Sequence, residues 1–148
     1  MKKIIFLLIY ILAVGSLYGC GYKPLYSSNE FLFKIDEITH NGTKIEKQIA
    51  KSLESMSNNE SSSIINFNLS SSRDKIIVSK NKNGDPEIFE LKISINIKVL
   101  NKQKTFMGKQ VYKSIENKFQ LKEFELQIEK QIMTKLMGEI IFFSMNLS

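Results

Sequence analysis

The sequence predicts an α+β fold: a two-layer sandwich in which a four-stranded sheet carries two helices on one face, in the order β-α-β-β-β-α. Two patterns lead to this fold class. Between Phe89 and Val99, six apolar residues alternate with polar ones without interruption, which indicates a long strand with one buried face. From Leu121 to Ile141, apolar residues recur every three or four positions, which predicts an amphipathic C-terminal helix of about 20 residues.

The first strand and the first helix are predicted ahead of that long strand. An alternating, β-rich segment runs from Phe31 to about His40 and is expected to form the first strand. Thr43 is followed three residues later by Glu46, which is the spacing of a capping box at a helix start. Apolar residues then recur at helical spacing, so a helix is expected from Thr43 to Ser57. The apolar face of this helix consists of Ile45, Ile49, Leu53 and Met56.

A second strand and a hairpin are expected next. Alternation over Ile65–Leu69 predicts the second strand, which either stops at the serines 70–72 or resumes after a break there, as Lys75–Val78. The dipeptide Asn83-Gly84 suits a tight hairpin, because both residues tolerate positive φ. The hairpin leads into the long third strand.

The fourth strand completes the sheet. It is expected at about Thr105–Glu116, after a loop at 101–104, and because it contains Gly108 an edge strand or a bulged strand is predicted. A sheet with one apolar face must be covered, and the two helices are the only available covers. Both helices are therefore expected on the same side, in a single domain that spans residues 31–148.

A signal peptide is predicted at the N-terminus. Two lysines, Lys2-Lys3, precede the uncharged apolar run Ile4–Val14 and the small residues Gly15-Ser16. The run has 11 residues, whereas a spanning helix needs about 20, so a cleaved signal peptide over residues 1–19 is favoured over a membrane-spanning helix.

The tetrapeptide Leu17-Tyr18-Gly19-Cys20 resembles the lipobox of bacterial lipoproteins, although Tyr18 is bulkier than the usual residue. The resemblance implies cleavage before Cys20, diacylglycerol on the Cys20 sulfur, and a further acyl chain such as palmitate on the new amino group. Several acyl chains give an anchoring to the membrane that one chain does not. Residues 20–30, which contain Pro24 and little periodicity, are expected to be a lipidated tether.

The composition argues against several kinds of site. The single cysteine cannot form an internal disulfide, and the single histidine, His40, has no partner for a zinc site. No glycine-rich phosphate loop or catalytic grouping is found, so we expect no cofactor and no enzymatic activity. Glu123, Glu125 and Glu129 lie among lysines on the final helix and are expected to form a solvated face.

The net charge is mild. Removing the two lysines of the signal peptide from the formal charge of +6 leaves +4, which fits ordinary solubility better than an anionic partner. The lysines alternate with apolar positions rather than with exposed aromatic residues, so nucleic-acid binding is not expected.

The heptapeptide Cys20-Gly21-Tyr22-Lys23-Pro24-Leu25-Tyr26 resembles the start of mature lipoproteins of the LptE family, which assembles lipopolysaccharide, in its alphaproteobacterial form. The element order and the Ser114-Ile115-Glu116-Asn117 segment before the last helix are consistent with it. The resemblance implies a non-catalytic protein of the outer membrane that is anchored through Cys20 and faces the periplasm. It further implies that the protein lodges in the LptD β-barrel, aids its assembly, and assists insertion of lipopolysaccharide into the outer leaflet.

Four lysines are candidate contacts for lipopolysaccharide phosphates or for acidic groups of the barrel: Lys92, Lys98, Lys109 and Lys113. An ordinary solvated sheet face is the alternative, because lysines there also deter edge pairing. Two other functions stay open. One is a lipoprotein subunit of a lipid or solute transporter, which would bind an apolar ligand between sheet and helices. The other is a lipoprotein enzyme, for which no catalytic residues can be named.

Overall fold

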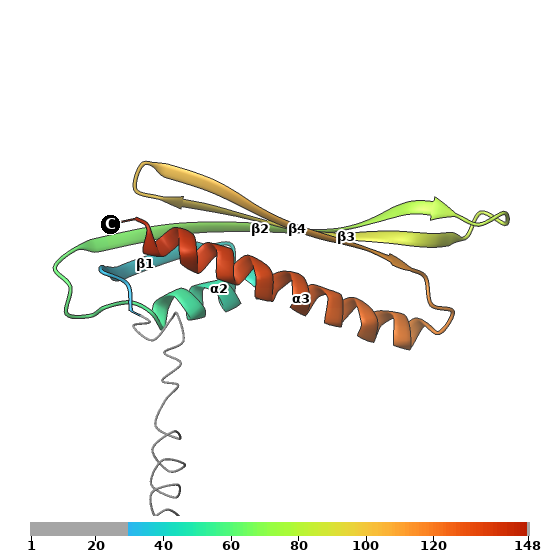
Figure 1. Ribbon diagram of the computed structural model, residues 1–148, viewed down its shortest axis with the longest axis horizontal. Helices are drawn as coiled ribbons and strands as arrows, with labels where there is room; N and C mark the ends of the chain where they lie inside the picture. Colours follow the sequence, from blue (N-terminus) through green and yellow to red (C-terminus); the bar gives the residue numbers. More distant parts are fainter. Residues whose placement is uncertain (1–29, 148) are drawn as a thin grey trace, which may run out of the picture.

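The computed structural model describes residues 30–147 and has the predicted element order (Figure 1). The predicted signal peptide, Cys20 and most of the predicted tether lie outside the described residues. The elements are β1 (Lys34–His40), α2 (Lys44–Glu54), β2 (Ile64–Lys80), β3 (Pro86–Val99), β4 (Lys102–Lys113) and α3 (Lys118–Met145).

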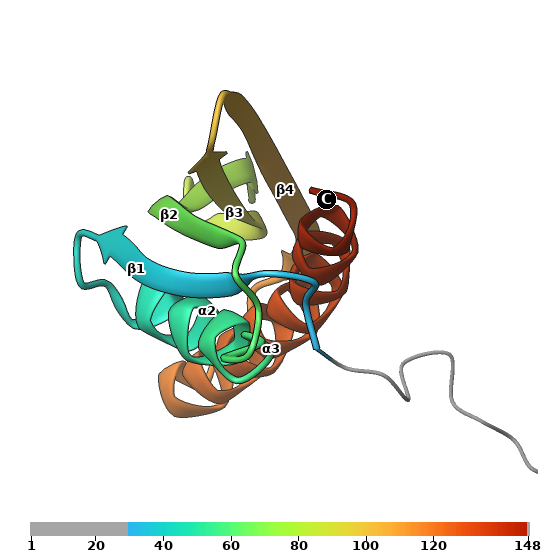
Figure 2. The ribbon, with the colours of Figure 1, turned by 90° about the vertical axis from the view of Figure 1, so that its left-hand side faces the viewer.

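The four strands form one mixed sheet in the order β1-β2-β3-β4. β1 runs parallel to β2, because the chain returns through α2, whereas β2, β3 and β4 are antiparallel neighbours joined by hairpins. Figures 1 and 2 show both helices on the same face of the sheet. The predicted α+β fold, with two helices on one face, is therefore confirmed.

The core lies between this face and the two helices. The odd-numbered residues of β3 from Phe89 to Val99 point into it, and Leu91, Ile93, Ile95 and Ile97 are completely buried. Burial of one such aliphatic side chain contributes about 1.5–3 kcal/mol. The helices supply the other wall, with Ile49 and Leu53 from α2 and Ile128, Leu136 and Ile140 from α3.

β2 is continuous, so the expected break at the serines 70–72 is wrong. All three serines pair with β3, opposite residues 94–96. Serine has a weak preference for strands, but the β3 ladder on one side supplies the pairing that local preference does not. The strand therefore extends as far as Lys80.

The N-terminal elements are shorter than expected. β1 begins at Lys34 rather than Phe31, although Phe31 and Phe33 are buried and their rings stack with centroids 4.8 Å apart. α2 ends at Glu54 instead of Ser57, and the amides of Met56 and Ser57 that follow bond carbonyls only three residues back. The capping box at Thr43 is confirmed.

The C-terminal elements also differ from their expected bounds. α3 has 28 residues instead of about 20 and begins after Asn117, whose side chain accepts hydrogen bonds from two amides of the first turn. β4 runs over residues 102–113 rather than 105–116, so most of the expected loop at 101–104 is strand and residues 114–116 are not. Val99 pairs with Lys102, which leaves a turn of Leu100 and Asn101, with Leu100 at φ 52°.

Gly108 lets α3 approach β4 closely. β4 is an edge strand, as one of the two predictions had it, but its register with β3 is unbroken and Gly108 marks no bulge. A Cβ atom added at Gly108 would lie 2.5 Å from Cγ2 of Ile132 and 3.5 Å from two atoms of Leu136. The glycine is therefore needed for helix packing.

Replacing Gly108 by alanine is expected to lower the free energy of unfolding by about 1–3 kcal/mol, because α3 must move away from β4. Denaturation by urea, followed by circular dichroism, measures the change. The matched control is Gly138→Ala on the exposed side of α3, where a new Cβ atom meets nothing within 4 Å. This control should be stabilised, by up to about 1 kcal/mol, because alanine favours helix. Equal losses in both variants would contradict the packing role of Gly108.

Candidate functional site

The sheet has one uncovered face, which we call the open face. It carries the even-numbered residues of β3 and their register partners on β2 and β4. All four candidate lysines lie on it. Lys92 and Lys109 are direct register partners, and Lys113 lies opposite Ile88 farther along the sheet. Lys98, six residues from Lys92 along β3, is roughly 20 Å away. The structure thus brings together only Lys92 and Lys109.

Carboxylates offset the charge of this lysine pair. Nζ of Lys109 lies 3.4 Å from Oε2 of Glu90, and Asp74 is the register partner of Lys92 on β2. Two lysines and two acidic residues therefore share this part of the open face. Lys92, Lys98 and Lys113 make no ion pair with a residue of the 30–147 region, and Lys98 and Lys113 also have no carboxylate as a register partner. These two have the freer ammonium groups for an anionic partner.

The middle of the open face is uncharged and mostly polar, with the exposed Met107 opposite Ser94 as its apolar member. Short hydroxyl and amide side chains line a shallow hollow of about 190 Å³, and they come from Ser70, Ser72, Ser94, Asn96 and Thr105. Oδ1 of Asn96 is shielded from solvent and accepts no hydrogen bond from the described part of the chain. Such a surface can exchange hydrogen bonds with a polar partner that lies flat against it.

Two ion pairs fasten α3 to β2 on the covered face. Arg73 Nε lies 2.7 Å from Oε2 of Glu129, and Lys75 Nζ lies 2.6 Å from Oε1 of Glu125. The hydroxyl of Tyr112 on β4 donates a 2.7 Å hydrogen bond to the same Glu125 oxygen. The expectation of a solvated face is therefore wrong for Glu125 and Glu129, whose side chains are only 13% and 15% exposed.

This cluster changes the acidity of two of its members. Burial alone would raise the pKa of Glu125, but hydrogen bonds from Lys75 and Tyr112 and the charges of Lys75 and Arg73 outweigh it, so the pKa is lowered. Burial, the hydrogen bond to Glu125 and its negative charge together raise the pKa of Tyr112 above its ordinary value. The cluster therefore holds an ionised carboxylate and a neutral phenol, which suits a structural clamp.

Arg73 and Lys75 were not singled out in the sequence. Their positions carried a signal, because they share the parity of the apolar residues Phe67 and Leu69 in an alternating strand. A basic residue at such a position needs a carboxylate across the interface. Which carboxylate it meets depends on the position of α3 against the sheet, which local patterns do not specify.

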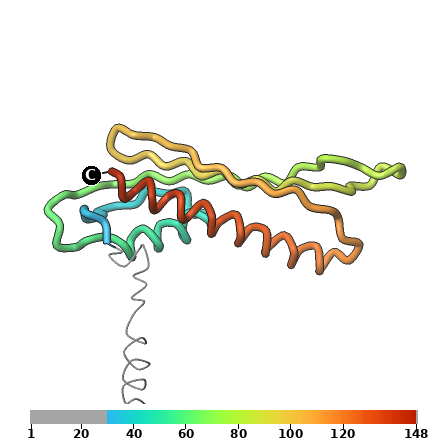
Figure 3. The backbone as a smooth tube through the Cα atoms, in the orientation of Figure 1, coloured from blue at the N-terminus to red at the C-terminus, as the bar shows by residue number. Residues whose placement is uncertain are grey.

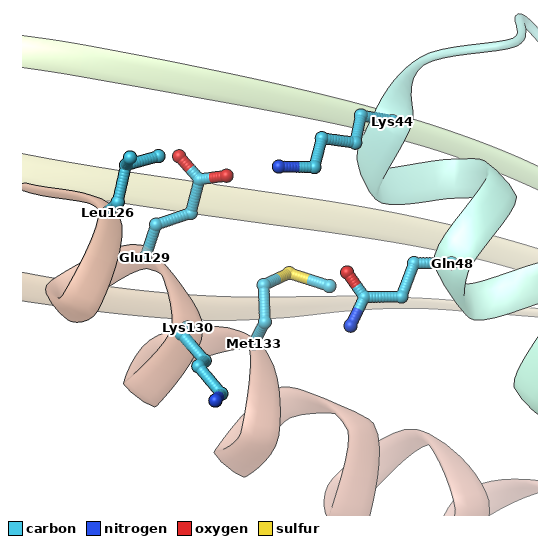
Figure 4. Close-up of a pocket in the computed structure, with 6 residues that line it drawn as sticks. All are labelled: Lys44, Gln48, Leu126, Glu129, Lys130 and Met133. Atoms are coloured by element: carbon cyan, nitrogen blue, oxygen red, sulfur yellow. The ribbon is translucent and has the colours of Figure 1, made fainter. Parts of the chain in front are cut away.

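A groove runs between the two helices beside β2; we call it the helix groove (Figure 4). It comprises two adjoining cavities of about 350 and 280 Å³, which share Lys44 and Glu129. In Figure 4, Lys44 and Gln48 reach from α2 toward α3, and Glu129 and Met133 reach back toward α2. The second cavity is closed by Ser71 and Arg73 of β2.

The described region contains no group of side chains that resembles a metal site. Between residues 30 and 147, no three His, Cys, Asp or Glu side chains are grouped so that they could hold a metal ion. Nδ1 of His40 accepts a hydrogen bond from the Gly42 amide at 3.0 Å and so stabilises the turn before α2.

The helices of the described region were also compared with the needs of a membrane span. None of them combines the length and the apolar character that crossing a bilayer requires.

Comparison with known proteins identifies the fold. The sequence matches no protein-family model and has no significant match among curated proteins. Solved structures do match. A lipoprotein B from Nitrosomonas europaea, determined by NMR, is 18% identical with a TM-score of 0.60, and the match covers 82% of this chain and 88% of that one.

Two crystal structures agree with this result. The rare lipoprotein B of Shewanella oneidensis is 13% identical with a TM-score of 0.51, covering 74% of this chain and 93% of that one. A protein of Caulobacter crescentus described as a lipoprotein is 13% identical with a TM-score of 0.53, covering 77% and 89%. At these identities the comparisons show that the chain shares the lipoprotein B fold.

Proposed function

We propose that the protein is a non-catalytic lipoprotein of the outer membrane that binds inside an LptD-type β-barrel. There it aids assembly of the barrel and insertion of lipopolysaccharide into the outer leaflet. The observation that carries the proposal is the Cys20-Gly21-Tyr22-Lys23-Pro24-Leu25-Tyr26 heptapeptide directly ahead of a domain with the lipoprotein B fold. The lipid on Cys20 would hold the domain at the membrane and raise its concentration near a membrane partner.

The open face supports a polar partner. The lumen of a large membrane β-barrel is lined by polar side chains, whereas its outer wall is apolar. The uncharged centre of the open face, with Asn96 and its serine and threonine neighbours, could exchange hydrogen bonds with such a lining. Lys98 and Lys113 at either end could add contacts to lipopolysaccharide phosphates or to acidic groups of the barrel.

The transporter-subunit alternative requires an apolar cavity between sheet and helices. In the described region that space is filled, because Leu91, Ile93 and Leu136 have no exposed surface. The cavities described here lie at the surface and are lined mainly by charged or polar side chains. No observation therefore favours this alternative.

Photo-crosslinking in intact cells tests the proposed partner. A photoreactive amino acid replaces Lys92 on the open face, and the comparison site is Lys135 on the exposed side of α3. We expect the Lys92 variant to capture a large outer-membrane β-barrel protein at several times the yield of the Lys135 variant, because the open face is the polar contact surface. The crosslinked product is identified by mass spectrometry.

Two results would contradict the proposal. Capture of an inner-membrane transporter from Lys92 would favour the transporter-subunit function, and absence of any product from both sites would argue against a plug that fills a barrel. Capture of the barrel from Lys135 alone would keep the partner but assign the contact to the helices instead of the open face.

A further inference from the structure

β2 has a free edge over half of its length. β1 pairs with β2 only from Ile64 to Leu69, whereas β2 has 17 residues and stays paired with β3 as far as Lys80. Figures 1 and 3 show that α2 and β1 lie along one half of the sheet, while β2, β3 and α3 continue past them. The sheet therefore has four strands in one half and three in the other.

Backbone groups along this free edge point away from β3. The amide of Ser71, the first pairing position beyond β1, donates a 2.8 Å hydrogen bond to Oε1 of Glu46 on the β1 side. Backbone direction alternates along an antiparallel ladder, so Arg73, Lys75 and Ile77 direct their amides and carbonyls to the same side. Within residues 30–147, nothing pairs with the backbone of these three residues on that side.

Natural proteins normally shorten, charge or cover such an edge, because it is a template for another strand. Here Glu46 ends the open ladder at one end and the register shift after Ile77 ends it at the other. Between them is a regular stretch without proline. A strand added there would continue the line of β1, and every second side chain would point into the helix groove.

The helix groove has space and apolar contacts for these side chains. One of its two cavities is lined by Ser71 and Arg73, and the other adjoins it through Lys44 and Glu129. Leu126, which lines the groove, is 41% exposed, and Ile77 is 46% exposed at the far end of the edge. Apolar surface at both positions would be buried by a docked strand.

The charge of the helix groove indicates which kind of segment can bind there. Arg73 is matched by Glu129, whereas Lys44 and Lys130 make no ion pair with any described residue. A second copy of β2 would add Arg73 and Lys75 to these cations, and the predicted tether carries Lys23 and Glu30, so its side chains bring no net negative charge. An acidic segment complements the groove, whereas a basic one is repelled.

We propose that the free edge of β2 and the helix groove form a docking site for an extended segment of another protein. Every second residue of this segment faces the helix groove, and these residues are acidic or apolar. The segment adds as a strand beside Arg73, Lys75 and Ile77. Its acidic side chains meet Lys44 and Lys130. This site is separate from the open face and is independent of the proposed binding of a barrel.

The test uses a defined peptide and the full-length chain in detergent. The peptide has the sequence Thr-Glu-Thr-Val-Thr-Glu-Thr and carries a fluorescent label. Fluorescence anisotropy is expected to show saturable binding, and a peptide with lysine in place of glutamate is expected to bind at least tenfold more weakly. Lys44→Glu with Lys130→Glu should weaken binding of the acidic peptide at least tenfold.

A matched control separates the groove from general charge. Lys47→Glu with Lys135→Glu makes the same charge change at exposed positions of the same two helices, and should change the dissociation constant less than twofold. Hydrogen exchange by NMR then tests strand addition. Amides of Arg73, Lys75 and Ile77 should gain protection on binding, while those of Asp74 and Ile76, which face β3, should not change.

Three results would overturn the proposal. They are no binding of the acidic peptide, equal binding of the acidic and basic peptides, or binding without new protection at Arg73, Lys75 and Ile77. A dimer that protects these amides without peptide, detected by light scattering, would assign the edge to a second copy of the chain.

Discussion

Replacing Cys20 by serine is expected to move nearly all of the protein from the membrane fraction to the soluble fraction. Each methylene group buried in a bilayer contributes about 0.8 kcal/mol, so several long acyl chains anchor a protein stably to the membrane. Serine at position 20 lacks the thiol that accepts diacylglycerol, and no other cysteine is available in the sequence. Ultracentrifugation of cell extracts followed by immunoblotting measures the change.

Mass spectrometry makes this result specific to lipid. The N-terminal peptide of the wild-type protein should begin at Cys20 and carry the added mass of the acyl groups, whereas the Cys20→Ser peptide should not. Ser28→Ala, a change in the predicted tether, is the control and should leave the protein in the membrane fraction. If the Cys20→Ser protein stayed with the membrane, the anchor would be elsewhere and the lipobox interpretation would be wrong.

The fold could be predicted because its signals are local. Uninterrupted alternation from Phe89 to Val99 defines a strand with one buried face, and the capping box at Thr43 defines a helix start. Both signals depend on neighbouring residues alone. Two apolar helix stripes and one apolar sheet face then leave a single two-layer arrangement.

The polar contacts on the covered face could not be predicted in the same way. Arg73 and Glu129 are 56 positions apart, and their contact depends on how far α3 slides along the sheet. That position is set by packing at Gly108, where Ile132 and Leu136 come close to the β4 backbone. A register set by tertiary packing has no counterpart in the periodicity of either element.

The free edge of β2 was hidden for a related reason. The second strand was expected to stop or break at serines 70–72, where the apolar alternation is interrupted. In the structure β3 holds them in the ladder, and the strand continues well past the end of β1. Only the three-dimensional pairing shows that the two neighbours of β2 differ in length, and hence that half of one edge is open.

The candidate lysines illustrate what alternation can and cannot establish. Lys92 and Lys98 lie on the solvated face of β3, as their parity in the strand indicated. Their neighbours across the sheet depend on the register of β2 and β4. That register places Asp74 opposite Lys92, and a basic surface on one strand is therefore partly neutralised by the next.

Glu46 joins the start of α2 to β2 through one buried carboxylate. Its Oε2 accepts a hydrogen bond from the Thr43 amide at 3.2 Å, which completes the capping box of α2. Its Oε1 accepts bonds from the amide and the hydroxyl of Ser71 at 2.8 and 3.0 Å. The carboxylate thus bonds the β2 backbone where the next β1 residue would pair, and it ends the open edge. The whole of Glu46 is buried.

Replacing Glu46 by glutamine is therefore expected to lower the free energy of unfolding by about 2–3 kcal/mol at neutral pH. The amide keeps the shape of the side chain but turns one acceptor into a donor, so either Thr43 or Ser71 loses its partner in a buried place. Urea denaturation at pH 7 measures the loss. The control is Glu54→Gln at the exposed end of the same helix, for which a change within about 0.5 kcal/mol is expected.

The pH dependence of this difference distinguishes the charge of Glu46 from its shape. Burial alone would raise the pKa of Glu46, but hydrogen bonds from Thr43 and Ser71 lower it below its ordinary value of 4.5 in the folded protein. The unfolded chain therefore binds the proton more readily, and the stability from this group is fully present above that ordinary value. It is lost as the pH falls through the lower pKa of the folded state. The difference in unfolding free energy between wild type and Glu46→Gln should thus be constant near neutral pH and shrink below about pH 4.5. A difference that stays constant down to pH 3 would show that the variant loses stability through packing alone, and that the carboxylate charge does not hold the start of α2 against β2.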